Sequence, residues 1–141
     1  MISVKDKKFK SKSKEAYFAW YEQGLRDLEV ADFCYNNEYY EWACFCYQEA
    51  TVKILKALLK KNNLESFRHS AFSLLEELSK KLPIDKELFN LSIELDKHYI
   101  MSRYPGANML QPPFKVYKKE MAQNAKIIAN KIIDFAKNHL I

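Results

Sequence analysis

The chain has 141 residues, of which 48% are hydrophobic and 29% charged, enough for one compact domain with a substantial core. It contains only 2 Gly and 4 Pro, and so few breakers exclude the many turns of an all-β fold. The formal net charge of +5 permits contact with a polyanion, but solvated lysine faces account for the same figure.

Residues 1–12 are lysine-dense and weakly patterned, so we expect a mobile basic arm. Beyond the arm, apolar residues recur at helical spacing in segments separated by Asn pairs and prolines. The expected helices cover residues 13–35, 38–61, 69–81, 85–102 and 118–139. Residues 103–117 are expected to form a single long loop. The sequence therefore predicts an all-α, up-and-down antiparallel bundle of four long helices and one short helix, as one domain over residues 13–141.

Two features indicate how the first two helices pack. Gly24 is unusual inside a helix, and we expect a neighbouring helix to approach it closely. The second helix carries a stripe that we expect to be buried, formed by Trp42, Cys46, Ala50, Ile54 and Leu58. Further aromatic residues surround this helix on almost all sides, which indicates a subunit interface. We assign that dimer interface to Tyr39, Tyr40 and Phe45.

The cysteines and histidines lack the spacing of a metal site. Cys34, Cys44 and Cys46 make an odd count without a CxxC pair, which is typical of reduced thiols in a cytoplasmic protein. Two glycines cannot build a phosphate loop, so we expect neither a metal nor another cofactor. No apolar run approaches the roughly 18 residues that span a bilayer, and no secretory leader is present, so we expect no membrane contact.

The densest cluster of reactive residue types lies around residues 95–106, where a helix gives way to the long loop. We interpret it as a small anion or nucleotide site. Arg103 would hold two oxygens of the ligand, Tyr99 or Tyr104 would donate a hydroxyl group, and Asp96 would orient Arg103. The alternative is structural: Arg103 bonds carbonyl groups of the loop and the two tyrosines pack.

Three stretches of this chain resemble the HEPN family, the higher eukaryote and prokaryote nucleotide-binding domains. The first is Trp20 with Asp27-Leu28 and Ala31, and the second runs from Gln48 to Leu59. The third is Leu95-Asp96 followed by Tyr99 and Ser102-Arg103-Tyr104-Pro105. The resemblance covers about residues 14–140.

The resemblance implies a helical bundle that forms a homodimer and pairs with a minimal nucleotidyltransferase, often as a toxin–antitoxin system. Some HEPN members are metal-independent RNases, marked by an Arg followed four to six residues later by a His. Here His98 precedes Arg103, and Arg68 is followed directly by His69, so that order is missing. Val52 stands where similar proteins often carry Glu.

We therefore expect a binding and interaction module that takes a nucleotide near Arg103. The ligand-binding residues would be Arg103, Tyr104, Tyr99 and Asp96. One alternative is an RNase or toxin acting on RNA, with Arg103 as phosphate clamp and His98 or His69 as acid and base. Another is a purely structural subunit.

Overall fold

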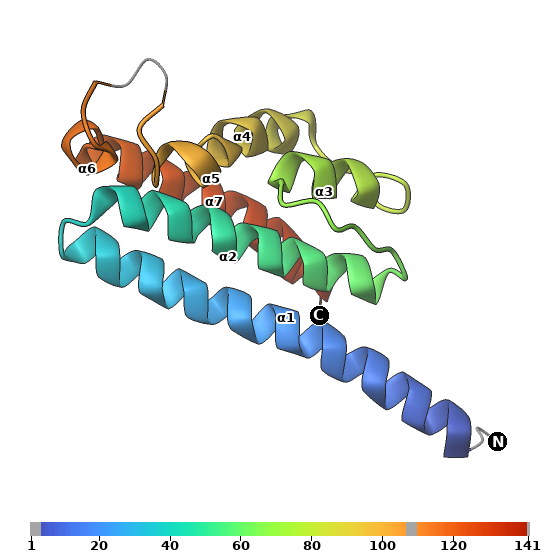
Figure 1. Cartoon of the computed structure of the whole chain (residues 1–141). Helices are drawn as coiled ribbons and strands as arrows, with labels where there is room; N and C mark the ends of the chain where they lie inside the picture. The colour runs from blue at the N-terminus through green and yellow to red at the C-terminus, as the bar shows by residue number, and fades with distance from the viewer. Residues whose placement is uncertain (1–3, 107–109, 141) are drawn as a thin grey trace.

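The structure, a computed structural model, describes residues 4–106 and 110–140, with side chains described from residue 16 onward. Its helices are α1 (Val4–Asn36), α2 (Tyr40–Lys61), α3 (Ala71–Leu78), α4 (Lys86–Asp96), α5 (His98–Met101), α6 (Pro113–Val116) and α7 (Lys119–Leu140). The chain direction alternates from α1 to α2, then to α3–α5 and finally to α7 (Figure 1). The predicted all-α, up-and-down bundle is therefore confirmed. Within the described residues, no helix combines the length and apolarity that crossing a bilayer requires.

The hairpin of α1 and α2 is held together by a close approach at Gly24. A Cβ atom added at Gly24 would lie 2.5 Å from Cγ1 of Ile54 and 3.2 Å from the carbonyl oxygen of Ala50. Real Cβ atoms do not come that near to a neighbouring carbon, so only glycine fits against α2 here. The expected close approach is confirmed, and it brings the polar residues of α1 within reach of α2.

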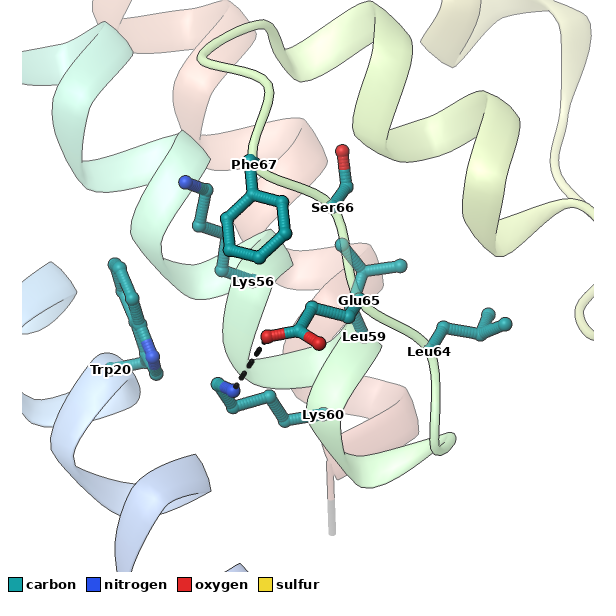
Figure 2. A pocket seen from close by; sticks show the side chains of 8 residues that line it. All are labelled: Trp20, Lys56, Leu59, Lys60, Leu64, Glu65, Ser66 and Phe67. Carbon is teal, nitrogen blue, oxygen red and sulfur yellow. Dashed lines mark ion pairs between the residues drawn. The ribbon is translucent and has the colours of Figure 1, made fainter.

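Residues 62–70 link α2 to α3 without regular secondary structure. Asn63 has a φ of 57°, the left-handed geometry that Asn tolerates better than most residues. The segment then runs beside α2, and together with α1 and α2 it borders a pocket of about 160 Å³ (Figure 2). The same segment carries His69, so its path decides where that side chain lies.

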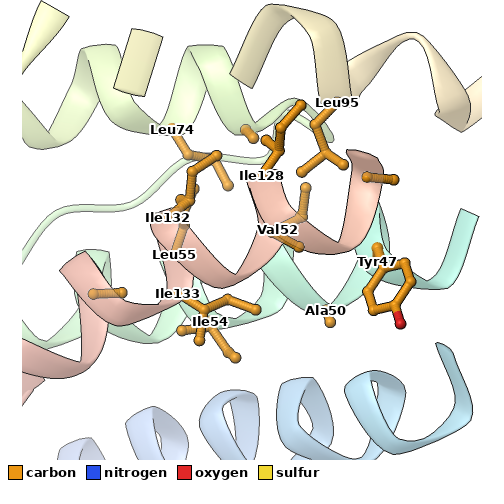
Figure 3. Packing of buried hydrophobic residues seen from close by; sticks show 14 of the residues in the cluster. Tyr47, Ala50, Val52, Ile54, Leu55, Leu74, Leu95, Ile128, Ile132 and Ile133 are labelled. Carbon is orange, nitrogen blue, oxygen red and sulfur yellow. The ribbon is translucent and has the colours of Figure 1, made fainter. Parts of the chain in front are cut away.

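The hydrophobic core lies where α2 meets α7, with α3 and α4 closing one side (Figure 3). Its largest members, each at most 2% exposed, include Ile54, Leu55, Leu74, Leu95, Ile128, Ile132 and Ile133. At about 25 cal/mol per Å² of buried apolar surface, this contact stabilises the fold more than any polar contact at the surface does. It also gives α2 a fixed frame, on which the candidate site described below is built.

Three expectations about boundaries and burial need correction. The predicted loop over residues 103–117 contains α6, since Pro113 starts a helical turn where a proline needs no N–H partner. Trp42 is 47% exposed, so it does not belong to the buried stripe. A spacing of four residues advances about 40° around a helix at each step, and the stripe drifts off the core over four steps. The predicted helix over 85–102 is divided at Lys97.

The predicted basic arm falls partly within α1, whose backbone is helical from Val4. This part of α1 extends past the end of α2 and away from the rest of the bundle (Figure 1). Residues 1–3 lie outside the described residues, as do residues 107–109 of the predicted loop. The mobility of the arm stays a prediction.

Candidate functional site

Arg103 follows α5 and lies against three aromatic rings. Its Nε and Nη2 atoms donate to the carbonyl oxygen of Tyr99, at 2.8 and 2.6 Å. Its guanidinium carbon lies 4.5 Å from the ring centre of Phe45, 4.6 Å from that of Tyr99 and 5.2 Å from that of Tyr104. We call these four residues the Arg103 platform. No carboxylate among the described residues forms an ion pair with Arg103.

The platform differs from the structural interpretation of Arg103 made from the sequence, whereas the role of Arg103 in ligand binding stays a prediction. The hydrogen bonds of its guanidinium group go to the last turn before the loop, so Arg103 does not bond carbonyl groups of the described part of the loop. The rings of Phe45 and Tyr99 are stacked with centres 6.4 Å apart, and the guanidinium lies close to both. Such stacking fixes a cation in place and leaves one guanidinium edge available for an anion.

Asp96 does not orient Arg103, so that part of the prediction is wrong. Its carboxylate accepts hydrogen bonds from the backbone N–H groups of Ala71 at 2.8 Å and Phe72 at 3.0 Å, in the first turn of α3. It also accepts from Oγ of Ser70 at 2.8 Å and Nε2 of Gln48 at 3.1 Å. Asp96 therefore caps α3 from another helix, which satisfies N–H groups that a helix start leaves without partners. A direct role in ligand binding stays a prediction.

His69 lies between an acidic residue and the platform. Its Nε2 atom is 2.5 Å from Oε1 of Glu49 on α2, and its ring centre is 4.3 Å from that of Tyr99. The His69 side chain is 31% exposed, against 15% for Glu49. The Asp96 cap fixes the start of α3 two residues downstream, and so it also fixes this histidine. The arrangement places an oriented imidazole beside Tyr99, and hence beside Arg103.

Glu49 belongs to a polar network that reaches across to α1. Nζ of Lys53 donates to Glu49 at 3.0 Å and to Asp27 at 2.5 Å. Burial by itself would raise the pKa of Glu49, but the hydrogen bonds from His69 and Lys53 outweigh it and hold that pKa below its usual value. Burial likewise would lower the pKa of Lys53, and its bonds to Asp27 and Glu49 raise it instead. Both groups therefore stay charged over a wide pH range.

His98 lies apart from this face, in the interior. It is 3% exposed, and its Nδ1 atom is joined to the hydroxyl group of Tyr117 at 2.8 Å. Burial lowers the pKa of His98 to about 4, with a smaller contribution from the positive charge of Lys97. At neutral pH His98 is an uncharged link between α5 and the residues before α7. Of the two candidate acid–base histidines, only His69 is accessible to a ligand at the platform.

The aromatic residues assigned to a dimer interface differ in exposure. Tyr39 is 56% exposed, whereas Tyr40 is partly buried with its ring 6.1 Å from that of Tyr35. Phe45 is partly buried under Arg103, and its outer side is met edge-on by Trp42 at 5.9 Å. Tyr39 and Trp42 therefore form the exposed aromatic surface at this end of α2.

Sequence reasoning missed the Glu49–His69 contact and the place of Phe45 under Arg103. A signal for the first was present, since Glu49 and Lys53 lie four residues apart on one helix face. Nothing in the sequence placed His69 opposite them, because residues 62–70 have no periodicity. Within the described part of the chain, no group of three or more His, Cys, Asp or Glu residues could hold a metal ion.

Fold and surface place the chain among small all-helical bundle proteins. A sequence profile of the HEPN domain matches residues 17–139. The structure is similar to TT1696 from Thermus thermophilus, with 31% identity, a TM-score of 0.83 and coverage of 87% of this chain and 97% of that one. The chain belongs to the HEPN domain family.

Two further solved structures support this assignment. ST0689, an archaeal HEPN homologue, is 30% identical, with a TM-score of 0.76 and coverage of 89% of this chain and 98% of that one. An HEPN domain protein from Thermotoga maritima is 30% identical, with a TM-score of 0.71 and coverage of 86% and 97%. No curated protein sequence matches the chain. The matched range of the profile, residues 17–139, includes the helices that carry the Arg103 platform.

Proposed function

We propose that this HEPN protein is a binding and interaction module that takes a nucleotide at the Arg103 platform. It forms a homodimer and pairs with a minimal nucleotidyltransferase, encoded nearby as a separate chain. The observation that carries the proposal is a partly buried arginine, stacked on aromatic rings, with no acidic partner among the described residues. A partly buried guanidinium without an acidic partner carries a charge that a phosphate group can neutralise through charge-assisted hydrogen bonds.

The geometry suits a nucleotide in two respects. Among the described residues, Nη1 of Arg103 has no hydrogen-bond partner, so this edge can donate to a phosphate oxygen. Tyr104 is 55% exposed and can stack with a base, as aromatic side chains do with any base face. The Glu49–His69 pair beside Tyr99 adds a polar group at the rim.

Titration calorimetry with ATP tests the ligand. We expect heat with the wild-type protein and a loss of affinity of at least about tenfold in Arg103→Ala, since a charge-assisted hydrogen bond contributes about 1.5–3 kcal/mol. Arg103→Lys keeps the charge but loses the planar fork, so its affinity should lie between the two. Arg26→Ala is the matched control, because Arg26 is exposed and its ion pair within the described part of the chain is with Glu29. Equal heats in wild type and Arg103→Ala would contradict nucleotide binding at the platform.

The proposals of a homodimer and of a partner protein are supported by features other than the Arg103 platform. Tyr39 and Trp42 leave aromatic surface in solvent at 56% and 47% exposure, and aromatic residues are enriched in interfaces. Co-expression of the chain with the neighbouring gene's product tests the pair. We expect both proteins to elute together in size-exclusion chromatography at a mass that contains two copies of this chain. Separate elution would count against the partner.

A metal-independent RNase is the second candidate, and one observation favours it. Glu49 orients His69 beside Tyr99, so an acid–base group and a phosphate clamp share one face. The test is incubation with structured RNA in EDTA. Cleavage that persists in EDTA and is lost in His69→Asn would establish the enzyme. If the protein forms the complex but shows no heat with ATP and no RNA cleavage, it is a structural subunit.

A further inference from the structure

A recess lies apart from the Arg103 platform, in the pocket between α1, α2 and residues 62–70. Its walls include Trp20 from α1, Lys56 and Lys60 from α2, and Leu64, Glu65 and Phe67 from the connecting segment. Figure 2 shows the Trp20 ring facing Phe67 across the opening, with the two lysine side chains between and below them. The recess therefore has aromatic walls and a positively charged rim.

The size of the pocket limits what can occupy it. Its volume of about 160 Å³ is well below the roughly 300–1,000 Å³ typical of sites for whole small-molecule ligands. A cavity of about 150 Å³ accommodates a single benzene ring. The volume thus fits one inserted aromatic side chain and cannot enclose a complete nucleotide.

Phe67 leaves a large apolar side chain in solvent at the edge of the pocket. It is 90% exposed, although it lies next to a recess that Leu59 and Leu64 also line. A single exposed phenylalanine is unremarkable by itself. An exposed phenylalanine beside an aromatic pocket is typical of protein interfaces, in which an aromatic ring of one partner packs against an aromatic ring of the other.

The positive charges of Lys56 and Lys60 favour a negatively charged partner. Nζ of Lys56 lies 5.2 Å from the ring centre of Trp20, and no carboxylate among the described residues pairs with it. Nζ of Lys60 lies 3.9 Å from a carboxylate oxygen of Glu65, whose side chain is 63% exposed, and no closer ion pair of Lys60 is present among the residues described. An incoming carboxylate can pair with Lys56 and can replace Glu65 at Lys60 at little cost, because exposed ion pairs are weak.

We infer that this pocket docks an acidic segment of a partner protein, which inserts one aromatic side chain beside Trp20 while its carboxylates contact Lys56 and Lys60. The inference deepens the proposed function, since the partner is the separate chain with which this protein pairs. It assigns that chain a contact point on the α1–α2 hairpin, separate from the nucleotide at Arg103.

The two tryptophans of the chain make a direct test, because Trp20 lines the pocket and Trp42 lies against Phe45 of the platform. The probe is the peptide acetyl-Glu-Glu-Phe-Glu-Glu-amide, added to the full chain at up to about 1 mM and followed by the indole N–H signals in two-dimensional NMR. We expect the Trp20 signal to shift and the Trp42 signal to stay. Replacing the peptide's Phe by Ala, or its Glu residues by Lys, should abolish the shift.

Variants place the binding on named side chains. Lys56→Gln and Phe67→Ser should each weaken peptide binding by roughly tenfold, as expected for anchor positions. The matched controls are Lys119→Gln and Phe114→Ser, which change exposed residues of the same types elsewhere. An unmoved Trp20 signal, an equal response to the lysine peptide, or unchanged affinity in Phe67→Ser would each overturn the inference.

The complex with the nucleotidyltransferase separates the two proposals. A complex that forms with the wild type and equally well with the Lys56→Gln, Phe67→Ser double variant overturns the docking site and leaves the proposed function standing. A complex formed by the wild type and lost in the double variant, while ATP still binds, supports the docking site. A peptide that shifts Trp20 when no complex forms supports the chemistry of the pocket and counts against the proposed function.

Discussion

His98 and Tyr117 are joined by a 2.8 Å hydrogen bond that ties α5 to the residues immediately before α7. Both residues are at most 3% exposed, so the bond lies inside the protein. It holds together the two ends of the chain segment between His98 and Tyr117, which contains α6. The loop anchor that the sequence assigned to Arg103 as an alternative is therefore supplied by a buried histidine.

Stability should fall with acid because His98 is buried. The pKa of His98 is lowered to about 4, from about 6.5 in an unfolded chain. Between these two values the unfolded state binds a proton that the folded state does not. The stability that the protein has with His98 uncharged is therefore fully present above about pH 6.5. As the pH falls to about 4, the free energy of unfolding decreases by about 3 kcal/mol. Urea unfolding across this range measures it. His98→Gln should start less stable at neutral pH and lack this additional slope, and an identical slope in both proteins would refute the assignment.

Gly24→Ala should destabilise the protein even though alanine favours helices by up to about 1 kcal/mol. The added methyl group meets Cγ1 of Ile54 at 2.5 Å, on the stiff, buried part of that side chain. We expect a net loss of about 1–3 kcal/mol from overpacking, measured by denaturant unfolding. Gly106→Ala is the matched control, because a Cβ there meets nothing within 4 Å and should leave stability unchanged or slightly higher. Equal effects at the two glycines would contradict the close approach.

Asp96→Ala should cost much more than removal of an ordinary helix cap. The carboxylate accepts four hydrogen bonds, and its loss leaves N–H groups of Ala71 and Phe72 without that partner. We expect the free energy of unfolding to drop by about 2–4 kcal/mol. Asp85→Ala is the comparison, since Asp85 occupies the N-cap position of α4 without a side-chain cap hydrogen bond. Its cost should stay below about 0.5 kcal/mol. Similar costs at both positions would show that Asp96 does not cap α3.

Trp42→Glu should convert a dimer into a monomer if the end of α2 is the subunit interface. A carboxylate there would be desolvated against the partner's aromatic surface, so the dimer should weaken by at least about tenfold. Sedimentation velocity measures the change. Ile127→Glu on α7 is the control, because Ile127 is exposed to a similar degree, 50% against 47%. A dimer that survives Trp42→Glu but not Ile127→Glu would move the interface to α7.

The fold could be predicted because apolar periodicity and few breakers determine where long helices run. The candidate site was harder, as Trp42 and Asp96 show. Trp42 belongs to a four-residue repeat, yet the repeat drifts around α2 and leaves Trp42 47% exposed at its end. Asp96, Tyr99 and Arg103 follow one another at spacings of three and four, which suggested one shared helix face. The partners of Asp96, however, include the N–H groups of Ala71 and Phe72 in a different helix. Sequence spacing predicts neighbours within a helix, whereas contacts between helices depend on packing.

The missing side chain of Gly24 has a chemical consequence one turn further along α1. Asp27 lies three residues on, and it reaches Nζ of Lys53 because the two helix axes are as close as glycine permits. Lys53 also holds Glu49, and Glu49 holds His69. A methyl group at position 24 would push the hairpin apart and lengthen the first contact of this series. The absence of a Cβ atom at Gly24 on α1 therefore helps to position the Glu49 carboxylate that contacts His69.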